Sequence, residues 1–90
     1  MKLREEVEKE KRRAAFAFQE IKVNDKEGAK DLFELAKSYF DDANYFYEKG
    51  KFLEAFELYA YLWGLLDAGA RLGLFDPGKA RKHYKIEQDF

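Results

Sequence analysis

Apolar residues recur every three or four positions along most of the chain, which is the spacing of an amphipathic helix. The pattern is interrupted between residues 23 and 28 and again near Gly50, and the only proline is Pro77. These interruptions predict three helices, at about residues 2–22, 25–49 and 52–73, followed by a tail at 76–90. Because the connections are short, successive helices should run antiparallel. The sequence therefore predicts one helical domain over residues 1–90, an all-α antiparallel three-helix bundle with a short C-terminal tail.

The first expected helix is highly charged, because ten of the twelve residues from Lys2 to Arg13 carry a charge. Pairs four residues apart, such as Glu5 with Lys9, would support this half from outside the core. Its basic side chains could form a binding patch, although a solvated helix with ion pairs is the simpler interpretation; they are Lys9, Lys11, Arg12 and Arg13. Only the later positions Ala14, Phe18 and Ile21 are predicted to be well buried.

The second expected helix follows Asn24, whose side chain could cap the first turn while Glu27, three residues later, completes a capping box. One apolar stripe predicts its buried face: Ala29, Leu32, Phe33, Ala36, Phe40, Ala43, Phe46 and Tyr47. The three alanines in this stripe recur every seven residues. A neighbouring helix is therefore expected to approach closely along that line.

The third expected helix contains three glycines, although a glycine inside a helix costs up to about 1 kcal/mol relative to alanine. On a helical wheel, Gly69 and Gly73 fall in the uncharged half, where they would let another helix approach, and Gly73 can also end the helix. Gly64 instead falls on the polar side, near Glu57 and Arg71. No neighbour within the bundle is implied there, so either the helix tolerates a weak point or a partner outside the bundle comes close to its backbone at Gly64.

The uncharged half of the third helix is wider than the stripe that a helix commonly turns to its own core. The excess apolar surface around Trp63 should be covered either by the tail from Phe75 onward or by a second chain. Of these two, a homodimer is favoured, because a chain of 90 residues gains much by pooling cores. The candidate interaction surface comprises Phe56, Ala60, Trp63, Gly64, Asp67 and Arg71.

The residue types present leave little room for catalysis. Without cysteine there is no disulfide and no thiolate metal site, and a reducing compartment is the default. Nucleophilic catalysis would depend on Ser38 and a single histidine, His83. The adjacent Asp41 and Asp42 diverge by about 100° on a helix and cannot easily share a metal ion. We therefore expect no enzyme activity, no cofactor and no metal site.

Charge is uneven along the chain although the formal net charge is only -1. The centre, from Asn24 to Asp67, is acidic, whereas the N-terminal segment and the tail at 79–85 are basic. The tail could contact phosphates, but it is more simply expected to fold back along the acidic second helix. No apolar run approaches the roughly 18 residues of a membrane span, and the charged N-terminus does not resemble a secretory signal. A soluble, cytoplasmic protein is expected, and abundant Lys and Glu with few Asn and Gln are typical of heat-loving organisms.

Two stretches of the chain resemble known families. The turn YEKGKFLEAF at 47–56 resembles a tetratricopeptide helical hairpin, whose turn glycine and packing residues correspond to Gly50, Phe52, Ala55 and Tyr59. Residues 36–75 resemble the archaeal domain-of-unknown-function family 357. The end of that family's motif is matched by Gly64, Leu66, Asp67, Ala68, Gly69, Arg71, Leu72 and Gly73. The resemblance implies a small archaeal helical protein and brings no established activity.

The function that these observations favour is a non-catalytic interaction module, which self-associates or docks a partner helix through its third helix. The alternative is a nucleic-acid-associated accessory protein that uses the basic N-terminal helix and the basic tail. Nucleic-acid binding is the less favoured of the two, because the central helices carry an acidic face rather than a basic stripe.

Overall fold

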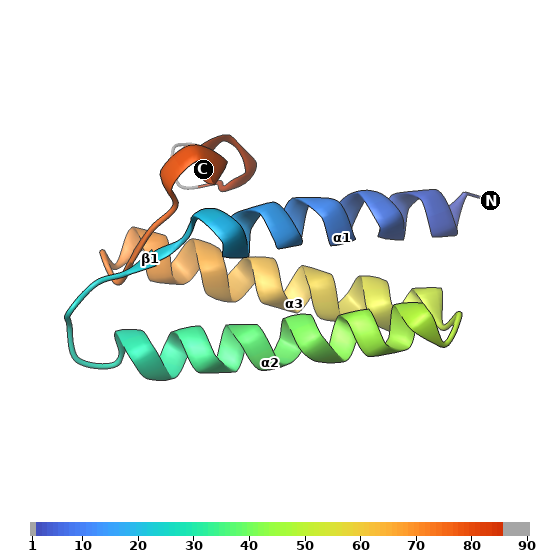
Figure 1. Cartoon of the computed structure of the whole chain (residues 1–90), viewed down its shortest axis with the longest axis horizontal. Coiled ribbons are helices and arrows are strands. Elements are labelled where there is room, and N and C mark those ends of the chain that lie inside the picture. The colour runs from blue at the N-terminus through green and yellow to red at the C-terminus, as the bar shows by residue number, and fades with distance from the viewer. Residues whose placement is uncertain (1, 86–90) are drawn as a thin grey trace.

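Three long helices dominate the computed structural model, which describes residues 2–85 (Figure 1). The all-α fold with a bundle of antiparallel helices is confirmed, and a pair of two-residue strands is added to it. In chain order, the elements are α1 (Leu3–Glu20), β1 (Lys22–Val23), α2 (Ala29–Glu48), α3 (Phe52–Arg71), β2 (Phe75–Asp76) and the 3₁₀ helix η1 (Gly78–His83). The last part of the expected tail, 86–90, lies outside the described residues.

The helices α2 and α3 form an antiparallel hairpin around Gly50, packed side by side along their length (Figure 1). Gly50 has the left-handed backbone expected of it, with φ +75°. Two N–H groups then close the end of α2: Gly50 N donates to Tyr47 O at 3.0 Å, and Lys51 N donates to Phe46 O at 2.9 Å. This turn reverses the chain within three residues. The likeness of the hairpin to a tetratricopeptide unit stays a prediction.

The start of α2 differs from the expectation. The helix begins at Ala29, after Gly28 with φ +85°, and no side chain caps it. Asn24 instead donates its side-chain Nδ2 to Gly73 O at 2.5 Å and its backbone N to Leu74 O at 2.8 Å. The expected capping box of Asn24 and Glu27 is therefore wrong, because Asn24 ties the α1–α2 connection to the end of α3.

The end of α3 is built on the expected terminator, Gly73, with φ +73°. Leu74 N donates to Gly69 O at 2.8 Å, so the chain reverses there and β2 pairs antiparallel with β1. This reversal lays the Phe75 ring over the last turn of α3, and a Cβ atom placed on Gly69 would overlap that ring. Gly69 therefore makes room for Phe75 rather than for a neighbouring helix, which corrects the expectation.

The core lies between the three helices. The expected close contact along α2 is present, since Ala29, Ala36 and Ala43 are all fully buried. From α1, Phe18 packs against Phe33 and Phe40 of α2, with ring centroids 5.8 and 4.8 Å apart. The charged half of α1 also contributes to the core, contrary to expectation. Its Val7 is fully buried although the neighbouring side chains are charged.

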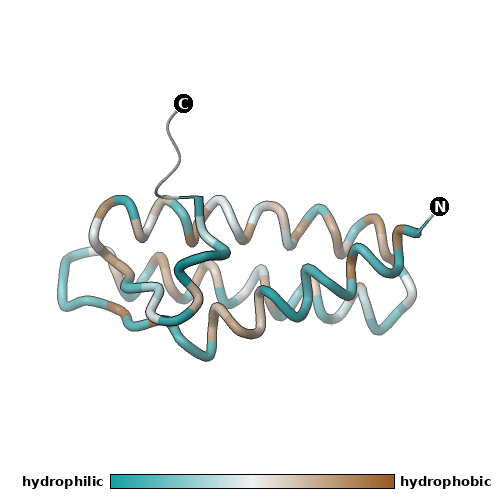
Figure 2. Tube along the Cα trace, turned by 90° about the horizontal axis from the view of Figure 1, so that it is seen from above, coloured by the Kyte–Doolittle hydropathy of each residue, from teal (hydrophilic) through white to brown (hydrophobic). Residues whose placement is uncertain are grey.

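The sequence suggested that the tail folds back along the acidic α2, and this expectation is wrong. The β1–β2 pair carries the chain back over the C-terminal half of α1, where η1 packs (Figure 1). Seen from above in Figure 2, the half of α1 nearest the N-terminus is largely hydrophilic, and η1 lies over the other half. The tail therefore reaches α1 and α3 because a short strand pair redirects it.

Candidate functional site

A groove of about 320 Å³ lies between α1, α3 and the segment that follows β2. Its lining consists of Glu10, Arg13, Phe56, Ala60, Trp63, Gly64, Asp67, His83 and Lys85. Five of the six residues of the candidate interaction surface are in this lining, because their spacing puts them on one side of α3. The sixth, Arg71, lies outside it and donates from Nη2 to Lys85 O at 2.6 Å.

The tail covers Trp63, which is only 9% exposed. The Tyr84 ring meets the indole edge to face at 5.4 Å between centroids, and the Arg13 guanidinium carbon lies 4.8 Å from the indole centroid. Of the two covers considered for this apolar surface, the tail is the one observed. Trp63 therefore gives no reason to expect a homodimer, and any partner must use other residues.

Arg13 holds the tail in place from α1. Its Nη1 donates to both carboxylate oxygens of Glu10, at 2.7 and 2.8 Å, and its Nη2 donates to His83 O at 3.1 Å. The ion pair is partly buried, and one guanidinium nitrogen serves both carboxylate oxygens while another reaches the tail. Arg13 thus acts as a structural clamp whose charge is already balanced by Glu10.

His83 packs edge to face on Phe16, with ring centroids 5.9 Å apart. Burial, followed by the positive charges of Arg13 and Lys82, lowers the pKa of His83 below its usual value. The environment of the imidazole therefore favours its neutral form. Within residues 2–85 no group of His, Asp and Glu side chains has the arrangement needed to hold a metal ion.

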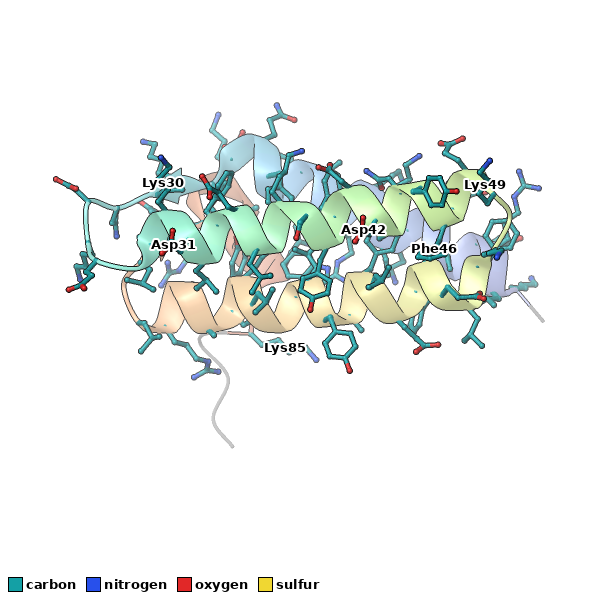
Figure 3. All side chains as sticks on the ribbon, turned by 90° about the horizontal axis from the view of Figure 1, so that it is seen from below. Lys30, Asp31, Asp42, Phe46, Lys49 and Lys85 are labelled. Atoms are coloured by element: carbon teal, nitrogen blue, oxygen red, sulfur yellow. The ribbon has the colours of Figure 1, made fainter. Side chains whose placement is uncertain are left out.

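The end of the groove is closed by backbone contacts to Lys85, which lies beside α3 in Figure 3. Asp67 accepts the Lys85 N–H at 3.1 Å, and Arg71 donates to the carbonyl of the same residue. Two buried polar atoms, Trp63 Nε1 and the Tyr84 hydroxyl, have no hydrogen-bond partner among residues 2–85. Burial and then the nearby Asp67 raise the pKa of Tyr84 to about 12.

Beyond the groove, α3 exposes an apolar face, which we call the outer face of α3: Leu53, Phe56, Glu57, Ala60, Tyr61, Gly64, Ala68, Arg71 and Leu72. Its large apolar side chains are unusually open, with Leu53 58%, Tyr61 66% and Leu72 68% exposed. A Cβ atom placed on Gly64 would meet no atom of the described residues within 4 Å. A shallow hollow lined by Glu57, Ala60, Tyr61 and Gly64 marks its centre.

Part of this face was not predicted from the sequence. Tyr61, Ala68 and Leu72 were not among the candidate residues, although Ala60, Gly64 and Ala68 recur every four positions and so mark one line along a helix. Four lining residues of the groove were not predicted either. They come from segments other than α3: Glu10, Arg13, His83 and Lys85. The path of the tail brings them to α3.

Two of the four residues of the basic patch considered on α1, Lys11 and Arg13, make contacts within the chain. Lys11 lies over the Tyr47 ring at 4.4 Å and pairs with Glu48 at 3.4 Å, while Arg13 pairs with Glu10.

In the part of the chain that the structure covers, no helix has the length and apolar character needed to cross a membrane.

Comparison with known proteins gives one match. A model of the family described as "Protein of unknown function (DUF357)" matches residues 4–75. The matched stretch contains α2, α3 and nearly all of α1, and it ends before η1. No curated protein and no solved structure showed significant similarity to the chain.

Proposed function

We propose that this chain, which belongs to the DUF357 family of proteins of unknown function, is a non-catalytic interaction module that docks a helix on the outer face of α3. The observation that carries the proposal is an exposed apolar helix face with a gap at its centre. Leu53, Phe56, Tyr61 and Leu72 surround positions occupied only by alanine and glycine. Contiguous apolar surface of this kind usually marks a contact.

Gly64 supports the proposal independently of exposure. A glycine in a helix interior costs roughly 0.5–1 kcal/mol relative to alanine, and within the described residues nothing crowds this position. A second helix can approach closely at Gly64, because the separation of helix axes, about 8–10 Å, depends on the side chains between them. A partner that packs against the backbone at Gly64 accounts for the glycine.

The chemistry of the adjacent groove supports a non-catalytic role. Its charged side chains hold one another and the tail: Arg13 pairs with Glu10, and Asp67 accepts from Lys85 N. A general base or nucleophile needs a partner aimed at a substrate, and the groups in this lining are aimed at the chain itself.

The absence of cysteine supports a reducing compartment, and we place the module in the cytoplasm on that basis.

Nucleic-acid binding receives less support than helix docking. Lys11 and Arg13 of α1 are engaged with acidic and aromatic side chains, so they contribute little to a phosphate-binding stripe. The other basic side chains of the patch, Lys9 and Arg12, lie on α1, and those of η1 lie in the tail, so none of them belongs to the outer face of α3. Salt-dependent retention of the chain on immobilised DNA or RNA would favour this alternative instead.

Photo-crosslinking tests the docking surface directly. A benzophenone amino acid placed at Tyr61, on the outer face of α3, should give a covalent adduct, either in the purified protein or in a lysate of its source cells. Tyr45 on α2 is the matched control, because it is a tyrosine of similar exposure, 58% against 66%. Absence of an adduct in both settings, or equal adducts from positions 45 and 61, would contradict the proposal.

A further inference from the structure

We infer that the helix docked on the outer face of α3 is the α3 of a second copy of this chain, antiparallel to the first and crossing it at Gly64. The inference rests on the proposed function, since it names the occupant of the same surface. It is carried by the order of residues on either side of Gly64, which is complementary to itself when one copy is reversed.

The small residues are arranged symmetrically about the crossing point. Ala60 precedes Gly64 by four residues and Ala68 follows it by four, and all three are exposed. In an antiparallel pair, a residue before the crossing point meets the residue equally far beyond it in the other copy. Ala60 therefore lies opposite Ala68 of the second copy on each side of the two glycines. No side chain larger than a methyl group stands at the crossing.

The charged residues are arranged in the same way. Glu57 precedes Gly64 by seven residues and Arg71 follows it by seven, and seven residues return to within about 20° of the same direction on a helix. Both side chains are exposed. Antiparallel packing thus places Glu57 opposite Arg71 of the second copy, and two-fold symmetry forms this pair twice.

The charge order also excludes the other orientation. In a parallel pair, Glu57 would face Glu57 and Arg71 would face Arg71, which is repulsive at both ends of the contact. Arg71 keeps its positive charge while it donates to Lys85 O, so it attracts a carboxylate of the second copy. Opposite charges at both ends therefore select the antiparallel arrangement.

Apolar side chains at the rim of the outer face of α3 would pack at the edges of this contact. Leu53, Phe56 and Leu72 flank the line of small residues, and Tyr61 is already supported by Tyr39 of α2, with the rings stacked at 6.1 Å. Trp63 takes no part, because the tail covers it. The second copy thus covers apolar side chains that the fold leaves exposed.

Disulfide trapping tests the geometry, because the natural chain has no cysteine. Gly64→Cys should give a disulfide-linked dimer on mild oxidation. Ala60→Cys alone should not, since its two copies would stand about 12 Å apart along the helix axis, beyond the reach of a disulfide. The double variant Ala60→Cys/Ala68→Cys should link again. Ala15→Cys, an exposed alanine on α1, is the matched control and should stay unlinked.

Charge exchange tests the complementarity in solution. Light scattering at tens of micromolar chain should give twice the monomer mass, and Glu57→Arg or Arg71→Glu alone should weaken the dimer by about tenfold or more. The double variant Glu57→Arg/Arg71→Glu should recover most of the affinity. Far-ultraviolet circular dichroism confirms that each variant is folded.

Several results would overturn the inference. These are a monomeric mass with no linkage through Gly64→Cys, linkage of Ala60→Cys as efficient as that of Gly64→Cys, or a dimer indifferent to all three charge variants. If the purified chain stays monomeric while the photo-crosslinker at position 61 captures a different protein, the second copy is excluded and the docking surface itself is retained.

Discussion

Glycine has three distinct uses in α3 and its C-terminal end. At position 73 it adopts the left-handed backbone that ends the helix, with φ +73°. At position 69 it makes room for the ring of Phe75, which is itself 3% exposed. At position 64 neither use applies, since the backbone is helical and the space around it is open. Substitution by alanine should therefore have a different effect at each site.

Gly69→Ala should lower the free energy of unfolding by about 1–3 kcal/mol, because the new methyl group would force the buried Phe75 ring out of its place. Gly64→Ala should raise it by up to about 1 kcal/mol through helix propensity. Urea unfolding at submicromolar concentration, where any self-association is negligible, measures both. The reverse order of stabilities would contradict the roles given to the two glycines.

Tyr84 and Tyr59 form a second contrast between like residues. The Tyr84 hydroxyl is buried and has no partner in the described part of the chain, whereas the Tyr59 hydroxyl donates to Asn44 Oδ1. At pH 7, Tyr84→Phe should leave stability unchanged or slightly raised, while Tyr59→Phe should cost about 1 kcal/mol through the lost hydrogen bond. Thermal melts of the two variants separate these outcomes.

The Tyr84 hydroxyl also predicts that stability depends on pH in the alkaline range. The pKa of Tyr84 is raised to about 12 in the folded chain, against about 10 in an unfolded one. Between these values the unfolded state binds fewer protons, so the free energy of unfolding falls as pH rises above 10. Urea titrations near pH 9 and pH 11 should show a smaller fall for Tyr84→Phe than for the natural chain. An equal fall would mean that Tyr84 ionises as freely when folded.

Among the elements, η1 depends most on a single side chain. Arg13 stacks on Trp63 of α3, donates to His83 O of the tail and pairs with Glu10 of α1, so Arg13→Ala removes the side chain that joins α1 to both the tail and Trp63. We expect a loss of about 1–3 kcal/mol and a red shift of the single tryptophan's fluorescence as the tail loosens. Lys37→Ala, which breaks an exposed pair with Asp41, should cost under about 0.5 kcal/mol and leave the emission unchanged.

The sequence predicted the elements whose residues repeat with the period of a helix. The buried stripe of α2, the turn at Gly50 and the grouping of Phe56, Ala60, Trp63, Gly64 and Asp67 in one groove all follow from spacings of three and four. These features needed no knowledge of the tertiary fold, because one helix carries each of them.

The features that the sequence did not predict depend on distant partners. Asn24 could equally cap a helix or bond to a backbone 49 residues away, and only the fold decides between them. Two-residue strands have no period that could reveal them, so the path of the tail could not be predicted either. Val7 was missed because a single apolar residue among charges is not a stripe.

For the whole molecule, the tail is an added cover on a bundle of three helices. The family match ends at residue 75, just before the residues that cover Trp63. A chain ending at Asp76 should keep its three helices but melt at a lower temperature, with tryptophan emission shifted to the red. It should also associate more strongly, since Trp63 would enlarge the exposed apolar surface. Circular dichroism, fluorescence and light scattering measure these three effects, and unchanged emission would contradict the role given to Tyr84.

The bond between Asn24 and the end of α3 has a kinetic consequence. The Asn24 contact closes a loop of 49 residues, whereas the α2–α3 hairpin forms across a turn of three. Because the longer loop costs more entropy to close, we expect the Asn24 contact to form late in folding. Asn24→Ala should therefore speed unfolding and leave the folding rate nearly unchanged in stopped-flow measurements. A slower folding rate would instead mean that the Asn24 contact is already formed in the folding nucleus. An unchanged folding rate would mean that the α2–α3 hairpin forms before Asn24 ties the α1–α2 connection to the end of α3.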